Sequence, residues 1–188
     1  MKYLMSLLVL FFSGVYADDY EEGIRSLKNK EYKKASQHFE KAAPMHHKLP
    51  SPHFGKALCE VALGHYDKVA QEMEKAHQML GVLSNAENLD LTPQTPEEQI
   101  SAYQCRQKVR KASQKLRLFV ERMVADSVPG FFQKIQMFRQ LNPYIDSLER
   151  SGLLCCQSGN TAECCREPLV RQLELWNSEG LSVESNSN

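Results

Sequence analysis

The chain lacks most of the sequence signals that identify an enzyme. No P-loop, G-x-S-x-G, H-E-x-x-H or G-x-G-x-x-G motif occurs in its 188 residues, so nothing points to the chemistry that these motifs serve. Basic and acidic residues balance at 23 each, and the chain as a whole is therefore not attracted to nucleic acid or to a membrane surface. We expect no catalytic residues, no cofactor and no nucleic-acid partner.

Long apolar runs are also missing, apart from one at the N-terminus. Lys2 precedes the run "YLMSLLVLFF" at residues 3–12, and Val15-Tyr16-Ala17 gives the small-x-small pattern of a cleavage site. The sequence therefore predicts a signal peptide at residues 1–17, followed by a secreted mature chain without a membrane span. The C-terminal "SNSN" is not a KDEL-type signal, so residence in the endoplasmic reticulum lumen is the alternative and would depend on a partner.

Cysteine is scarce, and none of the six cysteines belongs to a C-x-x-C motif. Adjacent cysteines seldom ligate one metal ion, and thiol redox catalysis favours C-x-x-C, so we expect neither a metal site nor a redox centre. An even count in an oxidising compartment indicates disulfides. We predict that all six are bonded, namely Cys59, Cys105, Cys155, Cys156, Cys164 and Cys165.

The pairing of these cysteines stays open. The turn at residues 157–163 is long enough to bring the adjacent pair 155–156 against the pair 164–165. Adjacent cysteines of this kind resemble those of the albumin family, in which they bridge neighbouring helices. Six cysteines nevertheless allow 15 connectivities, and the sequence does not choose among them.

An internal repeat is the most informative feature that is present. "YKKASQHFEKAA" at residues 32–43 aligns with "YDKVAQEMEKAH" at 66–77, an offset of 34 residues. Apolar residues recur at helical spacings of three and four within each copy, and Asn29-Lys30 and Leu63-Gly64 interrupt the helices at equivalent places. The pattern predicts two helix–turn–helix units within residues 18–80.

This period resembles that of the tetratricopeptide repeat superfamily over about 60 residues. The resemblance implies stacked helical hairpins with a concave groove that binds a protein partner. The sequence departs from the superfamily pattern at Ser26 and Glu60, where bulky residues are usual. "ALCE" at residues 57–60 also resembles the leprecan and cartilage-associated protein group, although the C-x-x-x-C spacing and the dioxygenase domain of that group are absent.

The rest of the chain is predicted to close the repeats. Residues 81–95 form a polar linker, and a capping box of Thr95 and Glu98 opens a helix that runs to about Ser127. Two shorter helices are expected at 131–141 and 144–151, because Pro143 favours a helix start.

A last helix is expected from Pro168 to about Trp176, and residues 178–188 are predicted to be disordered. The complete prediction is an all-α fold with two repeats and a helical cap at residues 96–177, because two repeats alone do not close a core.

Two surfaces are candidates for binding. In the superfamily that this chain resembles, chaperone-binding repeats hold the partner's C-terminal carboxylate with polar residues. This chain has apolar residues at the matching positions, so we expect an apolar groove. Its candidate partner-binding residues are Tyr20, Ile24, Phe54, Leu58 and Val61. Two alternatives stay open: the cap buries these residues, or the repeats and the cap enclose a small apolar ligand.

The second surface is basic. Seven lysines and arginines but only one acidic residue lie between residues 106 and 122, and Lys108, Lys111 and Lys115 share one helical face. An acidic polymer such as a sulfated glycosaminoglycan could bind there. The alternative is a solvated face, balanced by the acidic segment at residues 18–22.

Overall fold

The computed structural model describes residues 19–45, 51–83, 95–156 and 176. These residues are helical apart from short connections, which confirms the all-α prediction. The predicted signal peptide, the disordered tail, and the last helix up to Trp176 lie outside the described residues. The elements are a first helix at residues 19–28, α2 (Tyr32–Ala42), a short 3₁₀ turn (Ala43–Met45), α3 (Ser51–Leu63), α4 (Tyr66–Leu83), α5 (Pro96–Ser127) and α6 (Phe131–Cys155).

The first four helices form two hairpins whose turns repeat at the offset of 34 residues. Lys30 has a φ of 63° and Gly64 has a φ of 78°, a left-handed conformation that glycine adopts without strain. The amide of Glu31 donates to the carbonyl of Ser26, and the amide of His65 donates to that of Glu60, both at 2.9 Å. The internal repeat is thus present in the backbone geometry, while the relationship to the tetratricopeptide repeat superfamily stays a prediction.

Phe39 holds the two hairpins together. It is fully buried on α2, and α2 packs against α3. A Cβ atom added to Gly55 would lie 2.5 Å from Cζ of this ring, and one added to Gly23 would lie 2.8 Å from its Cε1. Because real Cβ atoms do not approach that closely, glycine at both positions is what lets the ring lie between the hairpins.

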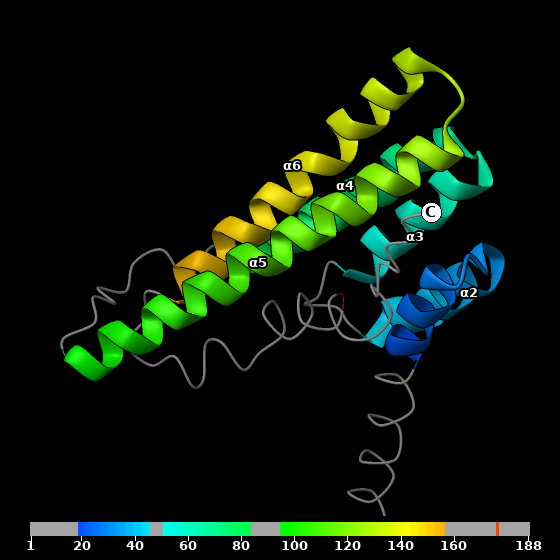
Figure 1. Cartoon of the computed structure of the whole chain (residues 1–188). Helices are drawn as coiled ribbons and strands as arrows, with labels where there is room; N and C mark the ends of the chain where they lie inside the picture. The colour runs from blue at the N-terminus through cyan, green and yellow to red at the C-terminus, as the bar shows by residue number, and fades with distance from the viewer. Residues whose placement is uncertain (1–18, 46–50, 84–94, 157–175, 177–188) are drawn as a thin grey trace, which may run out of the picture.

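The remaining two helices form a long antiparallel hairpin (Figure 1). The predicted capping box opens α5: Thr95 Oγ1 accepts from the Glu98 amide at 3.2 Å, and Glu98 Oε2 accepts from the Thr95 amide at 3.1 Å. Val128 ends α5 with extended backbone, as expected for a residue before proline. Both the start and the end of this helix are confirmed.

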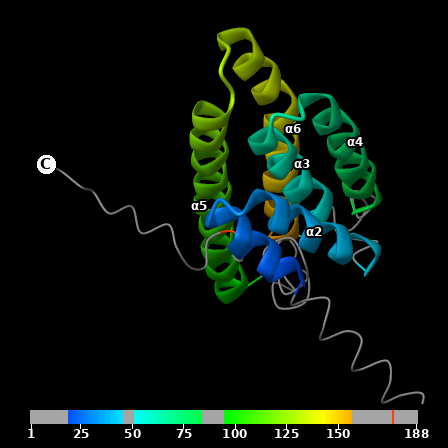
Figure 2. The same ribbon diagram turned by 90° about the vertical axis from the view of Figure 1, so that its right-hand side faces the viewer.

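The long hairpin closes the repeats. α6 packs against both α4 and α5, and α3 also contacts α5, so the three long helices run alongside one another (Figure 2). One continuous cluster of buried apolar residues extends from Tyr20 in the first helix to Trp176. The repeats and the C-terminal helices therefore share a single core.

Two predicted boundaries are corrected. Residues 131–141 and 144–151 were expected to form two helices, but α6 is continuous with Pro143 inside it. A proline removes one backbone hydrogen bond and costs about 3 kcal/mol within a helix. Pro143 lies on the exposed side, whereas its neighbours Leu141, Tyr144 and Ile145 are fully buried, and their burial offsets the cost. Likewise, α4 continues to Leu83, so residues 81–83 of the predicted linker are helical.

Candidate functional site

The five predicted partner-binding residues lie in the core. Phe54, Leu58 and Val61 are fully buried, and Tyr20 and Ile24 are each only 3% exposed. This corrects the expectation of an open groove, since none of the five offers a surface to a partner in this conformation. The alternative in which the cap covers them describes the structure.

Aromatic residues of the C-terminal part cover the repeats. Phe54 stacks on Tyr144 of α6 with ring centroids 4.6 Å apart, and its edge contacts Trp176 at 6.0 Å. Trp176 Nε1 donates to the hydroxyl of Tyr20 at 3.2 Å, and its ring also lies 6.0 Å from Phe119 on α5. These side chains pack against one another between the repeats and the long hairpin.

One disulfide joins the long helices. Cys105 on α5 is bonded to Cys156 at the end of α6, so neighbouring helices are bridged. Cys59 is buried and free, which corrects the prediction that it is bonded. Burial, and secondarily the charge of Glu60, raise the pKa of Cys59, so it stays a protonated thiol that is inert as a nucleophile. Cys164, Cys165 and the side chain of Cys155 lie outside the described residues.

Two histidine–carboxylate pairs occupy equivalent places in the two hairpins. His38 on α2 donates from Nδ1 to Asp19 Oδ1 of the first helix at 2.8 Å. His53 on α3 donates from Nδ1 to Glu72 Oε2 on α4, also at 2.8 Å. Asp19 and His53 are 34 residues apart, and so are His38 and Glu72. In the second hairpin, the histidine thus stands where the first has its carboxylate, and the carboxylate stands where the first has its histidine. Each of the four side chains has its hydrogen-bond partner within its own hairpin.

Glu72 is a nearly buried carboxylate with three basic partners. Its side chain is only 7% exposed, and it contacts Lys75 at 3.1 Å and Lys56 at 3.8 Å besides His53. Burial by itself would raise its pKa, but the hydrogen bonds from His53 and Lys75 and the charge of Lys56 outweigh burial and lower the pKa to about 2. Glu72 is therefore ionised throughout the physiological range.

We expect the Glu72→Gln variant to lose pH-dependent stability. Because the pKa of Glu72 is lowered from 4.5 to about 2 on folding, its contribution is complete above about pH 4.5 and is lost as the pH falls towards 2. The loss of unfolding free energy at pH 7 should be about 3 kcal/mol at most, and it should shrink at pH 3. Urea unfolding at both pH values measures this, with the exposed neighbour changed in Glu74→Gln as control. An equal loss at pH 7 and pH 3 would contradict this role of Glu72.

The basic residues of α5 divide into two groups. Arg117 lies between Asp146 and Glu149 of α6, and its guanidinium is 3.0 Å from the Glu149 carboxylate. Lys108 and Lys111 are exposed and Lys115 is partly exposed, and none of the three forms an ion pair with a described residue. Arg117 thus fastens the long hairpin, whereas the three predicted lysines keep their charges available.

The acidic N-terminal segment does not neutralise these lysines. Asp19 pairs with His38, and Glu22 pairs with Arg25 at 2.7 Å and Lys34 at 3.5 Å. Two of the three described carboxylates of this segment are thus engaged within the first hairpin, and the third, Glu21, forms no ion pair with a described residue. The alternative in which this segment balances the basic face of α5 has no support in the ion pairs of the described chain.

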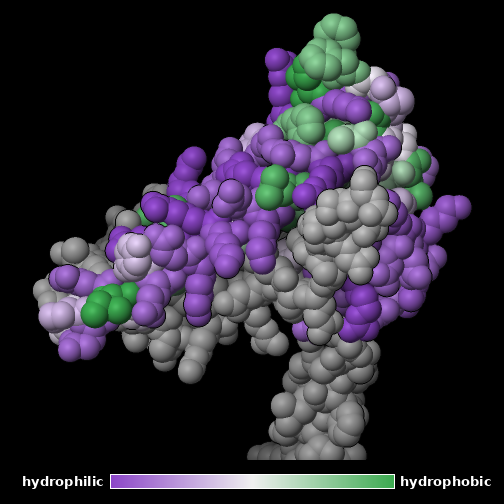
Figure 3. All heavy atoms as spheres, viewed as in Figure 1, coloured by the Kyte–Doolittle hydropathy of each residue, from purple (hydrophilic) through white to green (hydrophobic). Residues whose placement is uncertain are grey.

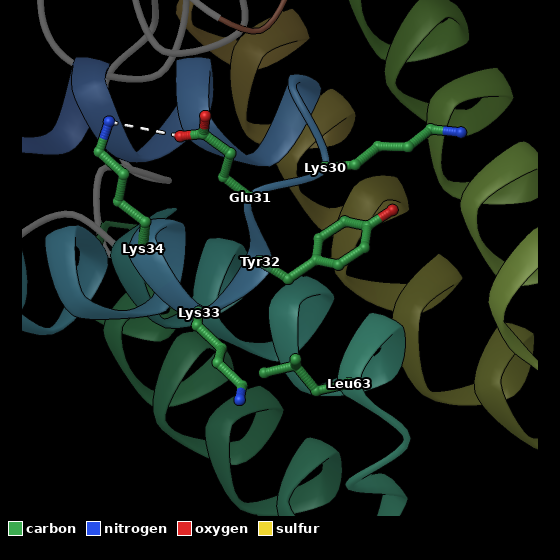
Figure 4. A pocket seen from close by; sticks show the side chains of 6 residues that line it. All are labelled: Lys30, Glu31, Tyr32, Lys33, Lys34 and Leu63. Atoms are coloured by element: carbon green, nitrogen blue, oxygen red, sulfur yellow. Dashed lines mark ion pairs between the residues drawn. The ribbon is translucent and has the colours of Figure 1, made fainter.

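An open hollow of about 500 Å³ lies beside the first interhelical turn (Figure 4). Lys30 and Tyr32 point to one side of it, and Lys34 pairs with Glu31 at 3.3 Å on the other. Burial and the charge of Asp126 raise the pKa of Tyr32, so its hydroxyl stays protonated. Three lysines and Glu31 line the hollow together with Tyr32 and Leu63.

The first turn of α6 carries two exposed aromatic residues that the sequence analysis did not single out. Phe131 is 72% exposed and Phe132 is 83% exposed, and their rings meet edge to face with centroids 5.7 Å apart. Hydrophobic residues are visible at this end of the hairpin at the top of Figure 3. The sequence "PGFF" at residues 129–132 could have indicated this exposed pair, because two aromatic residues directly follow a turn.

The backbone beneath this aromatic pair is firmly held. The Tyr66 hydroxyl donates to the carbonyl of Ser127 at 3.2 Å, and Lys134 Nζ donates to the carbonyl of Ala125 at 2.9 Å. Val128 is buried between the helices. Phe131 and Phe132 are therefore presented on a fixed support.

Neither a metal-binding cluster nor a membrane-spanning helix occurs among the described residues. In the part of the chain that the structure describes, no three histidine, cysteine, aspartate or glutamate side chains lie together as a metal ion would require. None of the described helices combines the length and the apolar character that crossing a membrane requires.

Comparisons with protein-family models, with curated proteins and with solved structures find no match to this chain. The functional interpretation accordingly depends on the geometry of the chain itself.

Proposed function

We propose that the protein is a non-enzymatic protein-interaction module of the secretory pathway or the extracellular space. The observation that carries the proposal is the exposed aromatic pair, Phe131 and Phe132, at the fixed end of the long hairpin. The Cys105–Cys156 disulfide supports the compartment, since disulfides persist in oxidising environments.

The aromatic pair has the properties of a protein-binding anchor. Aromatic residues are enriched at the centres of interfaces, where a few of them supply most of the binding energy. Two large side chains that are more than two-thirds exposed gain most when a partner removes them from water, at about 25 cal/mol per Å² of apolar surface. Their fixed support lowers the entropy lost on binding. The partner that fits is a protein with an apolar cleft.

The contacts elsewhere also favour binding over catalysis. Among the described residues, the histidine–carboxylate pairs are directed into hairpin contacts, and the thiol of Cys59 is buried. Covalent or acid–base catalysis would need such groups free beside an accessible pocket. The buried aromatic groups instead lock the repeats to the long hairpin.

A photo-cross-linking amino acid at position 132 tests this proposal in secreting cells. A protein that cross-links there is purified and titrated against the wild type and against the Phe131→Ser/Phe132→Ser variant. Since two interface anchors are lost, affinity should fall about tenfold to a hundredfold. The Ile100→Ser/Tyr103→Ser variant is the matched control, because those side chains are also exposed, at 59% and 60%, but lie at the other end of α5. Unchanged affinity of the Phe131→Ser/Phe132→Ser variant, or an equal loss in the control, would reject the aromatic pair.

A further inference from the structure

The outer face of α5 carries a row of positive charges. Lys108, Lys111, Lys115 and Arg122 follow one another at intervals of three, four and seven residues, which places them along one side of the helix. This basic stripe extends about 21 Å along the axis at 1.5 Å per residue. Polar residues dominate the visible face of α5 in Figure 3.

No counter-charge in the described chain answers the stripe. None of its four members forms an ion pair with a described residue, although Arg117, on the same helix, is held by two carboxylates of α6. Two acidic residues of α5 lie near the stripe. Glu121 lies about 100° around the helix from Arg122, and Asp126 lies one turn beyond Arg122 but forms no ion pair with it. The local field is therefore positive although the whole chain has a formal net charge of zero.

We infer that the basic stripe is a binding site for a linear sulfated polysaccharide. The charges lie in a straight row on an exposed helical face, a form that suits an extended polyanion bound through its sulfate groups. A folded acidic protein would bury an apolar patch as well, but Leu118 is the single large apolar residue that is exposed between Lys108 and Arg122. The site is separate from the aromatic pair and does not depend on the proposed function.

Binding of the wild-type protein to immobilised heparin is the first measurement. The interaction should be strong at about 50 mM NaCl and should weaken steeply by about 150 mM, where the screening length falls to about 8 Å. Heparin from which the sulfates have been removed should bind much more weakly, because it keeps only its carboxylates.

The second measurement uses the Lys108→Gln/Lys111→Gln/Lys115→Gln variant. Three exposed charge interactions are lost, so we expect affinity for heparin at low salt to fall about tenfold or more. Helical content should not change, since glutamine is also a good helix former. The control is Lys33→Gln/Lys41→Gln/Lys68→Gln, which removes the same charge from exposed positions on α2 and α4.

Three results would overturn the inference. The wild type could fail to bind heparin at low salt. The control variant could lose as much affinity as the stripe variant, which would make net charge the cause. Polyglutamate could bind at the stripe while heparin does not, which would assign the site to an acidic polypeptide. The Phe131→Ser/Phe132→Ser variant should bind heparin like the wild type, so failure of the protein-interaction proposal would be recognised separately.

Discussion

Replacing Cys105 and Cys156 with alanine should lower the free energy of unfolding by about 4 kcal/mol. The disulfide closes a loop with a sequence separation of 51 residues, and in the chain-entropy treatment a loop of that length restricts the unfolded chain by about this amount. Guanidinium unfolding of the Cys105→Ala/Cys156→Ala variant and the wild type, both without reductant, measures the difference.

The disulfide lies at a place where α5 and α6 already pack closely. It ties the open end of the long hairpin, where a Cβ atom on Gly152 would lie 2.9 Å from Val109, so α5 and α6 are in close contact just beside it. Cys59→Ala is the control, because it removes a buried thiol without opening a loop and should cost clearly less. A loss below about 1 kcal/mol in the double variant would show that packing alone fixes the hairpin.

Truncation of Phe54 should be comparably severe. Phe54 is fully buried and contacts Tyr144 and Trp176, so Phe54→Ala leaves a cavity between the repeats and the long hairpin. Buried phenylalanine-to-alanine changes cost about 3–5 kcal/mol. Trp176 is the only tryptophan of the chain and is 4% exposed, so its fluorescence should shift to longer wavelength in the variant and should report the unfolding transition of both proteins.

This variant distinguishes a core residue from a binding residue. Phe132→Ala removes the same side chain from a position that is 83% exposed, and it should change stability by less than about 0.5 kcal/mol. If Phe54 instead belonged to an open groove, Phe54→Ala would be equally mild. Similar stabilities for the two variants would therefore contradict the burial of Phe54.

Features that depend on neighbouring residues could be predicted from the sequence. Thr95 and Glu98 form the expected capping box, and Val128 leaves helical geometry because proline follows it. The turns at Lys30 and Gly64 occur where the repeat alignment placed them. Each of these outcomes is decided within a few residues, so tertiary contacts do not override it.

Features that depend on residues far apart in the sequence could not be predicted. Pro143 remains inside α6 because the flanking Tyr144 and Ile145 are buried against other helices. The choice of Cys105 as the partner of Cys156 depends on how α5 and α6 align. The five candidate groove residues are buried, and an apolar face alone does not determine whether a partner or the chain itself covers it.

The exchanged histidine–carboxylate pairs have a consequence for how the chain finds its fold. Two hairpins of similar sequence could trade helices, in one molecule or between two, as repeated units are prone to do. If the first helix took the place of α3 against α4, Asp19 would lie beside Glu72. If α3 took the place of the first helix against α2, His53 would lie beside His38. Each exchange replaces two opposite partners, now 2.8 Å apart, with two of like kind. The inverted order of acid and base thus makes each helix selective for its own neighbour, and a chain in which both pairs had the same order would lack that discrimination.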